Sequence, residues 1–477
     1  IGIRKTFGAS RSQLAMQFIS ESLVVLFTSL CLSLILVRLS LPLFNELSGK
    51  ALSFSILTNM NMLLGILGMM GVIGILAGWY PAFILSSLSP NKVMKSSKGG
   101  NHSQFQLRKI LIGAQFTIVI ILIACTTMMF RQIHFLQQTD LGFDKEAVLT
   151  TVFDFGDEAK YNTLKQALLS HPDVSSVSVA SRIPSGSLNN EGGVLPEGQT
   201  DGIVIPFVHV NFDYFKTLGI KAKQGRLFSD QYQADATESI ILNQAAVKFL
   251  GIQGDPIGQT IKCTWPKSTR NIVGIIDDIH FESLYNKIKP AVFLINYPDV
   301  YHMIVKLESS DLISSQKTVT EVCQSIYPDE VIEFSFLDSI LEQRYQKDYK
   351  TFQLMGFFAA LAIILACMGL LGMASFMMTS RTKEIGIRKV NGAKVGEIIR
   401  MLNSDFVKWI AIAFVIGTPI AFYTMQKWLE NFAYKTALSW WIFALAGFIT
   451  IVIVLLTVSW QTYSAARKNP VKSLRYE

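Results

Sequence analysis

Residues 385–393 read Ile-Gly-Ile-Arg-Lys-Val-Asn-Gly-Ala, and residues 1–9 read Ile-Gly-Ile-Arg-Lys-Thr-Phe-Gly-Ala. Each copy is followed by two long apolar runs and then by a basic segment with a matched proline, which begins at Pro90 after the first copy and at Pro470 after the second. A pattern that recurs together with its flanking elements is the signature of a repeated structural unit. The sequence therefore predicts two related modules that bracket the middle of the chain.

The apolar runs indicate that these modules lie in a membrane. A helix needs about 20 apolar residues to cross the hydrocarbon core. Runs of about that length lie near residues 17–41, 60–85, 108–130, 351–379, 405–427 and 437–461. Of the 477 residues 50% are hydrophobic and 16% charged, and the mean hydropathy is +0.36. This composition excludes a wholly soluble enzyme, and six such runs are too many for the buried helices of a soluble protein.

The distribution of charge predicts the orientation of the spans. Residues 131–350 hold 28 of the 35 acidic and 20 of the 43 basic residues, so this segment carries a net charge of −8 and the remainder +16. The basic excess lies in short loops beside the apolar runs, on one side of the predicted membrane. By the positive-inside rule that side is the cytoplasm, and 131–350 lie outside. Basic residues placed in this way favour a lipid bilayer as partner and no nucleic acid.

The middle segment has the pattern of a mixed α+β domain, with short alternating runs between amphipathic helices. Expected strands lie at 174–180, 203–210, 239–242, 272–276, 303–307 and 332–336, and expected helices at 159–169, 214–218, 244–250 and 313–326. Residues 339–350 continue as a polar helix into the span at 351–379, which predicts a helical connection between domain and span.

These observations predict an α-helical membrane protein with six transmembrane helices and an inserted α+β domain that lies outside the cytoplasm. We divide the chain into residues 1–98, the end of a first membrane module; 108–130, the first span of a second; 131–350, the inserted domain with its stalk; and 351–477, a three-span domain whose segment 381–402 contains the second copy of the repeat. The chain starts inside a motif, at Ile1, which predicts a fragment of a longer protein.

The sequence carries no motif for catalysis. It lacks G-x-x-x-x-G-K-[ST], H-E-x-x-H, C-x-x-C and G-x-S-x-G, so we expect no catalytic, cofactor or metal site. The polar run Asp277-Asp278-Ile279-His280 follows a strand, and a turn capped by Asx side chains accounts for it better than a metal site. Cys263 and Cys323 lie in the segment predicted to be outside the cytoplasm, where cysteines can oxidise. The sequence leaves open whether they form a disulfide, because it does not show whether their Cα atoms are close.

At this point the residues resemble a known family, the permease subunits of ABC transporters of the macrolide-exporter and cell-division-permease type. Residues 384–393 are similar to its cytoplasmic coupling segment. Residues 215–220 (Phe-Lys-Thr-Leu-Gly-Ile), 225–229, 242–246, 256–258 and 273–281 are similar to its periplasmic core domain. The family implies a four-span module. Residues 108–475 match one module and 1–95 the end of another, as in tandem eight-span permeases.

The resemblance implies mechanotransmission. A separate cytoplasmic ABC ATPase dimer docks beneath the coupling segments, so that the chain itself is not an enzyme, and ATP-driven closure moves the spans and changes the shape of the periplasmic domain. The implied docking residues are Gly2, Arg4, Lys5, Gly8, Ala9, Glu384, Gly386, Arg388, Lys389, Gly392 and Ala393.

The resemblance leaves open a periplasmic adaptor or outer-membrane component as a further partner, and either intramolecular pairing of tandem modules or a homodimer. It places the chain in the bacterial cytoplasmic (inner) membrane. The leading expectation is a permease that expels or extracts a substrate from the periplasmic side. The alternative is a non-transporting signalling or scaffold protein that activates a periplasmic partner.

Overall fold

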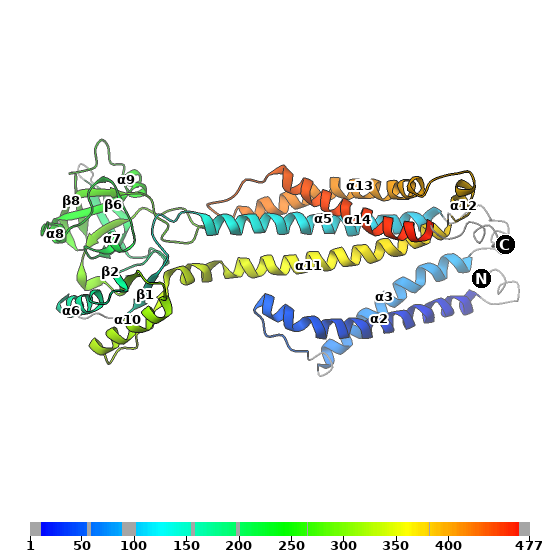
Figure 1. Cartoon of the computed structure of the whole chain (residues 1–477), viewed down its shortest axis with the longest axis horizontal. Coiled ribbons are helices and arrows are strands. Elements are labelled where there is room, and N and C mark those ends of the chain that lie inside the picture. The colour runs from blue at the N-terminus through cyan, green and yellow to red at the C-terminus, as the bar shows by residue number, and fades with distance from the viewer. Residues whose placement is uncertain are drawn as a thin grey trace. The chain divides into compact units, whose positions relative to one another are not determined.

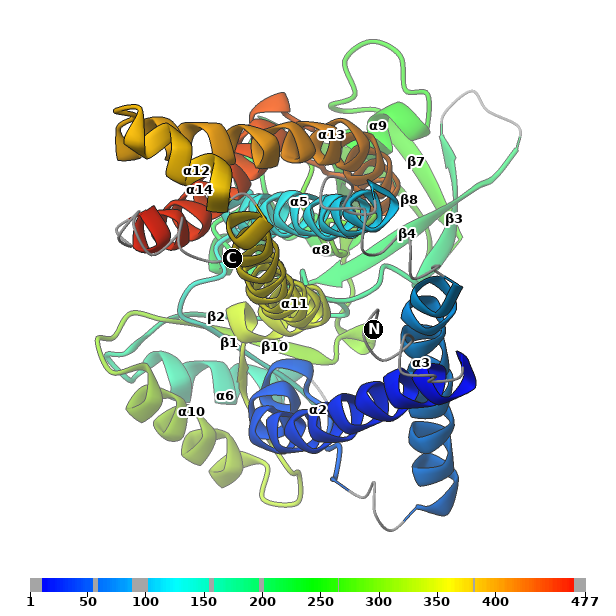
Figure 2. The ribbon, with the colours of Figure 1, turned by 90° about the vertical axis from the view of Figure 1, so that its right-hand side faces the viewer.

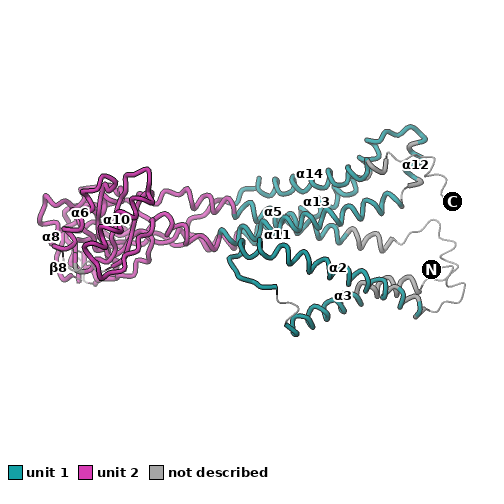
Figure 3. Tube along the Cα trace, turned by 60° about the horizontal axis from the view of Figure 1, so that its bottom comes forward, with its two compact units in different colours: residues 1–129, 349–425, 438–477 teal, residues 130–348, 426–437 magenta. Residues whose placement is uncertain are grey.

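The computed structural model describes residues 11–54, 59–87, 102–153, 158–196, 201–264, 266–380 and 382–466. The chain divides into two compact units (Figure 3). Unit 1 comprises residues 1–129, 349–425 and 438–477, and unit 2 comprises residues 130–348 and 426–437. Unit 2 is therefore built from the middle segment together with a short piece of chain that lies far from it in sequence.

Unit 1 is made of long apolar helices. They belong to α2 (Arg11–Ser48), α3 (Met60–Ser87), α5 (His102–Gln138), α11 (Leu337–Ser380), α13 (Val395–Leu429) and α14 (Trp440–Ala466) (Figure 1). Helices α2, α5, α11, α13 and α14 each contain a stretch long and apolar enough to cross a membrane, and the part of α3 whose side chains are described gives a shorter apolar helix, Met60–Ile75. Helices α2 and α3 pack against each other (Figure 2). Helices suit a bilayer because they satisfy their backbone groups internally.

Three of these helices extend beyond unit 1. The ends of α5 from residue 130 and of α13 from residue 426 belong to unit 2, as does the start of α11 up to residue 348. Helix α11 is continuous over 44 residues, which confirms the predicted helical connection from 339–350 into the span. The extensions of α5 and α13 past their apolar runs were not predicted.

The strands of unit 2, as far as the structure describes them, form one sheet of mixed direction. Its members are β1 (Val148–Val152), β2 (Val174–Ala180), β3 (Glu191–Pro196), β4 (Ile203–Val210), β5 (Ala222–Gly225), β6 (Ser239–Asn243), β7 (Thr260–Thr264), β8 (Lys267–Ile276), β9 (Val292–Ile295), β10 (His302–Leu307) and β11 (Ser335–Phe336). The order β4-β3-β7-β8-β6-β9 closes on itself, because β9 also pairs in parallel with β4. These strands form a small barrel, and β11-β1-β10-β2 form a wing beside it.

Helices of unit 2 cover the sheet. They are α6 (Glu158–Leu169), α7 (Tyr214–Thr217), α8 (Asp235–Glu238), α9 (Gln244–Phe249) and α10 (Leu312–Ile326), with the 3-10 turn η1 (Tyr297–Asp299) after β9. Helices α6 and α10 contact each other, and α6 and α7 both contact β2. The expected α+β domain is thereby confirmed.

Alternation along the barrel strands separates two hydrophobic cores. On β4, Ile205 and Phe207 pack in one cluster with residues of β3, β6, β7, β8 and β9. Val208 and Val210 pack in a second cluster that includes α7. Because successive side chains of a strand point to opposite faces, the first cluster fills the barrel and the second lies outside it.

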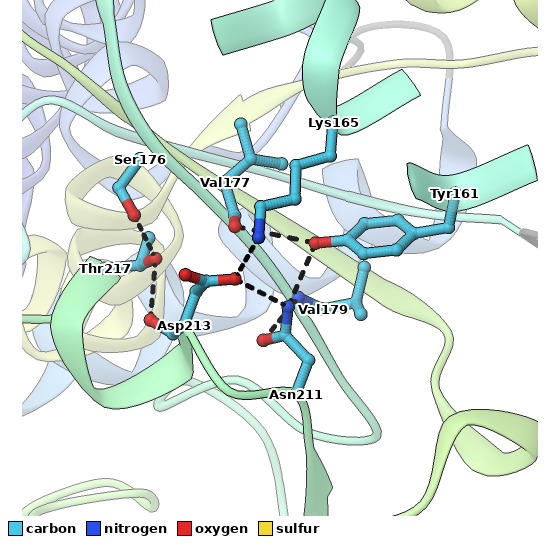
Figure 4. A network of polar contacts seen from close by, with 8 residues as sticks. All are labelled: Tyr161, Lys165, Ser176, Val177, Val179, Asn211, Asp213 and Thr217. Carbon is cyan, nitrogen blue, oxygen red and sulfur yellow. Dashed lines mark hydrogen bonds and ion pairs between the residues drawn. The ribbon is translucent and has the colours of Figure 1, made fainter. Parts of the chain in front are cut away.

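A buried polar network joins the wing to the barrel (Figure 4). Strands β2 and β4 pair through Ala180 and Val210. Just beyond β4, the Asn211 amide oxygen accepts from the Val179 N–H at 3.3 Å, and its nitrogen donates to the Tyr161 hydroxyl of α6 at 3.0 Å. Lys165 of α6 forms an ion pair with Asp213. The network satisfies polar groups that would otherwise be costly to bury, and it fixes α6 and the chain before α7 against β2.

Most expected strands are found near their predicted bounds, and β2 and β4 agree residue for residue. Strands β1, β3, β5, β7 and β9 were not predicted. Strand β9, Val292–Ile295, is a run of four apolar residues that is buried throughout. Such a run lacks the alternation that identifies a half-buried strand.

Candidate functional site

The predicted coupling segment forms a short helix, a glycine turn and the start of a long helix. Helix α12 spans Thr382–Val390, and Gly392 follows it with φ of +89°. The N–H of Ala393 donates to the carbonyl of Arg388 at 2.9 Å. A left-handed glycine just past a helix is a common C-terminal cap, because glycine adopts positive φ without a steric penalty.

Charged side chains lie on α12. Glu384 and Arg388 form an ion pair at 2.8 Å one turn apart, and both side chains are about half exposed. The guanidinium of Arg388 also contacts the sulfur of Met401 on α13. Gly386 is buried. An exposed ion pair of this kind contributes little to stability, so the pair is available to a partner at small cost.

The structure brings together the second copy of the predicted docking residues. Glu384, Gly386, Arg388 and Lys389 lie on α12, and Gly392 and Ala393 form the turn after it. The residues of the first copy lie outside the described part of the chain: Gly2, Arg4, Lys5, Gly8 and Ala9. After this turn the chain enters the next apolar helix directly, because α13 runs for 35 residues from Val395.

A second cluster, which the sequence did not reveal, lies at the other end of α13. We call it the clasp and define it as residues 428–436 with Gln132, Leu284, Tyr285 and Tyr345, all in unit 2. The ring of Phe432 stacks on Tyr285 with centroids 4.3 Å apart, and Trp428 meets Phe432 edge-on at 4.9 Å. His280 meets Tyr434 edge-on at 4.7 Å. Aromatic pairs in these geometries add stabilisation beyond the area they bury.

Hydrogen bonds fix the path of the clasp. The N–H of Ala433 donates to the carbonyl of Tyr285 at 3.1 Å. Gln132, which is fully buried on α5, donates from Nε2 to the carbonyl of Tyr434 at 2.9 Å. Its Oε1 accepts from the N–H of Thr436 at 2.9 Å. One side-chain amide thus satisfies a main-chain acceptor and a main-chain donor, which holds α5 to the segment between α13 and α14.

The start of α11 joins the same cluster. The hydroxyl of Tyr345 accepts from the N–H of Leu284 at 3.0 Å, and the Tyr285 hydroxyl donates to Asp348. Burial raises the pKa of Tyr285, and Asp348 raises it further, so the phenol remains protonated and serves as donor. The clasp therefore ties together the ends of α5, α11 and α13 inside unit 2.

The polar run at 277–280 has a structural role. The Asp278 carboxylate accepts from the N–H of Ala245 at 2.8 Å at the start of α9, and Asp277 accepts from Lys223 at 2.8 Å. Burial lowers the pKa of His280. Within the described residues no group of three or more His, Cys, Asp or Glu side chains could hold a metal ion. The Asp278 carboxylate thus caps α9, an element other than the run itself.

The disulfide that the sequence left open is not formed. Cys263 and Cys323 are both free and buried. Cys263 packs inside the barrel, and Cys323 packs in the cluster beneath α10. Burial raises the pKa of Cys263 to about 11 and that of Cys323 to about 12. Both thiols are therefore protonated packing residues.

Two family models match the chain. The model described as FtsX-like permease C-terminal matches residues 1–90 and 356–470, and so covers both copies of the repeat. The model described as MacB-like periplasmic core domain matches residues 116–316, which include most of unit 2.

Curated relatives and a solved structure are similar to parts of the chain. The chain is 24% identical over 257 residues to the macrolide export ATP-binding/permease protein MacB of Neisseria meningitidis, a match that covers 51% of this chain and 38% of that protein. It is 22% identical over 279 residues to the uncharacterized ABC transporter permease YknZ of Bacillus subtilis, covering 56% and 69%. The periplasmic region of MacB from Actinobacillus actinomycetemcomitans matches 44% of this chain and 97% of that structure at 14% identity and a TM-score of 0.33.

The chain thus spans less than half the length of the MacB relative, at 38%. Its two FtsX-like segments flank the MacB-like core domain in sequence, as the apolar helices of unit 1 flank the mixed sheet of unit 2. The chain thus carries an FtsX-like permease region and a MacB-like periplasmic core domain, and it is similar to ABC transporter permeases of this kind.

Proposed function

We propose that this permease couples ATP hydrolysis by a cytoplasmic ATPase to movement of unit 2. The observation that carries the proposal is the course of α13. This helix begins at Val395, directly after the glycine turn of the predicted docking residues, and ends at Leu429, inside the clasp. A continuous helix transmits displacement along its axis, because its turns are hydrogen-bonded to one another; α13 stays helical through Pro419, where one such bond is missing.

In this proposal the ATPase docks on α12 and on the matching segment at residues 1–9. The exposed Arg388 and the basic residues near it suit a partner with acidic and apolar surface. The name of the MacB relative includes both ATP binding and permease. This chain contains no P-loop motif, and we propose that its ATPase is a separate subunit.

The clasp is the proposed output of this coupling. When α13 shifts, residues 428–436 shift with it, and the stacked Phe432 and the hydrogen-bonded Gln132 convey the displacement to Tyr285 and to α5. Unit 2 then changes shape on the periplasmic side and expels or extracts a substrate there. The membrane is the bacterial inner membrane, with unit 2 in the periplasm.

Two matched variants test the docking step. Arg388→Glu reverses an exposed charge on α12, and Lys317→Glu reverses an exposed charge on α10 of unit 2 as the control. Both are purified with candidate ABC ATPases from cells that express the parent protein, and ATP turnover is measured. We expect Arg388→Glu to lose the ATPase and Lys317→Glu to retain it. Retention of full turnover by the folded Arg388→Glu protein would contradict docking on α12.

A third variant separates docking from transmission. Phe432→Ala removes the stacked ring of the clasp and leaves α12 unchanged. We expect it to retain the ATPase and to lose ATP-dependent change in the hydrogen exchange of residues 280–286. If that ATP-dependent change persists, α13 does not act through the clasp.

A further inference from the structure

One end of the barrel opens into a cavity of about 400 Å³. Strand β3 runs antiparallel to β4, and β9 runs parallel to β4. The start of β3 and the ends of β4 and β9 therefore lie at the same end of the barrel. The lining comes from the start of β3, from β4, from η1 after β9 and from the residue before β10, and we call this cavity the barrel-mouth cavity. The mouth of a β-barrel is a frequent location for ligand sites.

Two side-chain amides on its wall are held in fixed orientation. The Nη2 atom of Arg182 donates to Oδ1 of Asn189 at 2.6 Å and to Oδ1 of Asn190 at 2.7 Å. A guanidinium has only donors, so the amide atoms that face it are the carbonyl oxygens. The two NH₂ groups are then turned away from Arg182, and neither has a protein partner within the described residues. The cavity wall thus carries two oriented donors.

Carboxylates line the same cavity. Glu191 is exposed beside the two amides, and Asp299 lies on η1. Asp299 is fixed by Asn296 at 2.7 Å and by Nδ1 of the buried His209 at 3.2 Å. Burial lowers the pKa of His209 more than Asp299 raises it, so this imidazole is neutral at pH 7. The fixed donors therefore stand beside carboxylate acceptors.

Two aromatic rings complete the lining. Phe207 is 3% exposed and forms an apolar floor, and Gly192 permits this position because a Cβ there would lie 2.1 Å from the ring. Tyr301 is 45% exposed and stands at the rim. A few oriented polar groups over an apolar floor are the usual composition of a small-molecule site.

The combination of groups selects one ligand class. An ammonium group has only donors and leaves both amide NH₂ groups unpaired, while an anion is repelled by Glu191 and Asp299. An extended peptide binds through its main chain to a free sheet edge, whereas the groups that this cavity presents are side-chain amides and carboxylates. A hydroxyl both donates and accepts, so neighbouring hydroxyls satisfy amides and carboxylates together. We propose that the barrel-mouth cavity binds a glycosyl or similar polyhydroxyl group.

The test is a titration of the detergent-solubilised full chain, followed by saturation-transfer NMR. The probes are the methyl glycosides of glucose, N-acetylglucosamine and rhamnose, and vesicles that carry a glucosyl diacylglycerol distinguish a lipid headgroup from a free saccharide. The detergent must lack a sugar headgroup, since a maltoside would compete. Choline, inorganic phosphate and trialanine represent the excluded classes.

Variants localise the binding. We expect at least one glycoside to bind, and Asn189→Ala/Asn190→Ala together to weaken it about tenfold or more. Asn162→Ala changes an exposed asparagine on α6 and should leave binding unchanged. Glu191→Gln, which keeps the shape of an exposed side chain, should also weaken binding. The proposal is overturned if no glycoside or glycolipid binds, if one of the excluded classes binds instead, or if binding survives both the double variant and Glu191→Gln.

Discussion

The rings of Tyr285 and Phe432 stack with their centroids 4.3 Å apart and their planes at 20°. Tyr285 lies between β8 and β9, whereas Phe432 lies between α13 and α14. Residues 426–437 therefore pack as part of unit 2, although both flanking helices lie largely in unit 1. This contact gives the segment between two apolar helices a specific partner in the α+β unit.

Removing the stacked ring should loosen this attachment. Phe432 is 3% exposed, and a buried Phe→Ala change costs about 3–5 kcal/mol. We expect Phe432→Ala to lower the thermal unfolding temperature of unit 2, read by differential scanning calorimetry. Phe249→Ala on α9, where the ring is 53% exposed, serves as the control and should have a small effect. Equal effects of the two changes would mean that the stack adds no stability.

Gln132 should be sensitive even to an isosteric change. Glutamate at this position keeps an acceptor for the Thr436 N–H and loses the donor to the Tyr434 carbonyl. A buried group left without its partner costs about 1–3 kcal/mol. We expect Gln132→Glu to raise the hydrogen-exchange rates of residues 433–437 while the barrel strands stay protected. Unchanged exchange in this segment would show that water replaces the lost hydrogen bond.

Gly392 and Gly396 provide a matched pair in the coupling segment. Gly392 has φ of +89°, where any side chain is strained, and alanine there costs about 1–2 kcal/mol. Gly396 lies within α13, and a Cβ added there meets no atom within 4 Å. Alanine in a helix is favoured over glycine by about 0.5–1 kcal/mol. We therefore expect Gly392→Ala to reduce ATPase binding in co-purification, and Gly396→Ala to preserve it. Similar binding by the two variants would contradict a role for the turn.

The Arg226–Asp235 ion pair predicts a pH dependence of stability. Asp235 is fully buried, and its carboxylate accepts from Arg226, from the Ser239 hydroxyl at 2.7 Å and from the Ser229 N–H at 3.1 Å. Burial opposes ionisation, but these hydrogen bonds outweigh it and hold the pKa of Asp235 below its usual value. The native pKa thus lies below the unfolded value of about 3.9.

The contribution of Asp235 is therefore complete above the unfolded pKa and is lost as the pH falls through the native pKa. We expect the unfolding temperature of the wild-type protein to fall more steeply below about pH 4 than that of Asp235→Asn. At neutral pH the variant should be less stable by about 1–3 kcal/mol, since the amide NH₂ of asparagine cannot accept the hydrogen bonds that the buried carboxylate accepts. Parallel pH profiles for the two proteins would contradict this assignment.

The sequence alone predicted those features that depend on local pattern. Apolar runs identified the membrane helices, and the short runs of the middle segment identified β2 and β4 at their observed bounds. The repeat at 385–393 placed Arg388, Gly392 and their neighbours in one segment, because those residues are adjacent along the chain. Such features depend only on the period of the apolar residues and on residues that are neighbours along the chain, so the sequence is sufficient to predict them.

Only the tertiary structure decided which distant segments meet. Closure of the barrel depends on β4 and β9, which pair across more than 80 residues, and β9 has no alternation to reveal it. The clasp joins Gln132 to Thr436 across 304 positions. Neither residue stands out in the sequence. Glutamine and threonine form a specific contact only where burial removes water, so that each has to satisfy the hydrogen-bonding groups of the other.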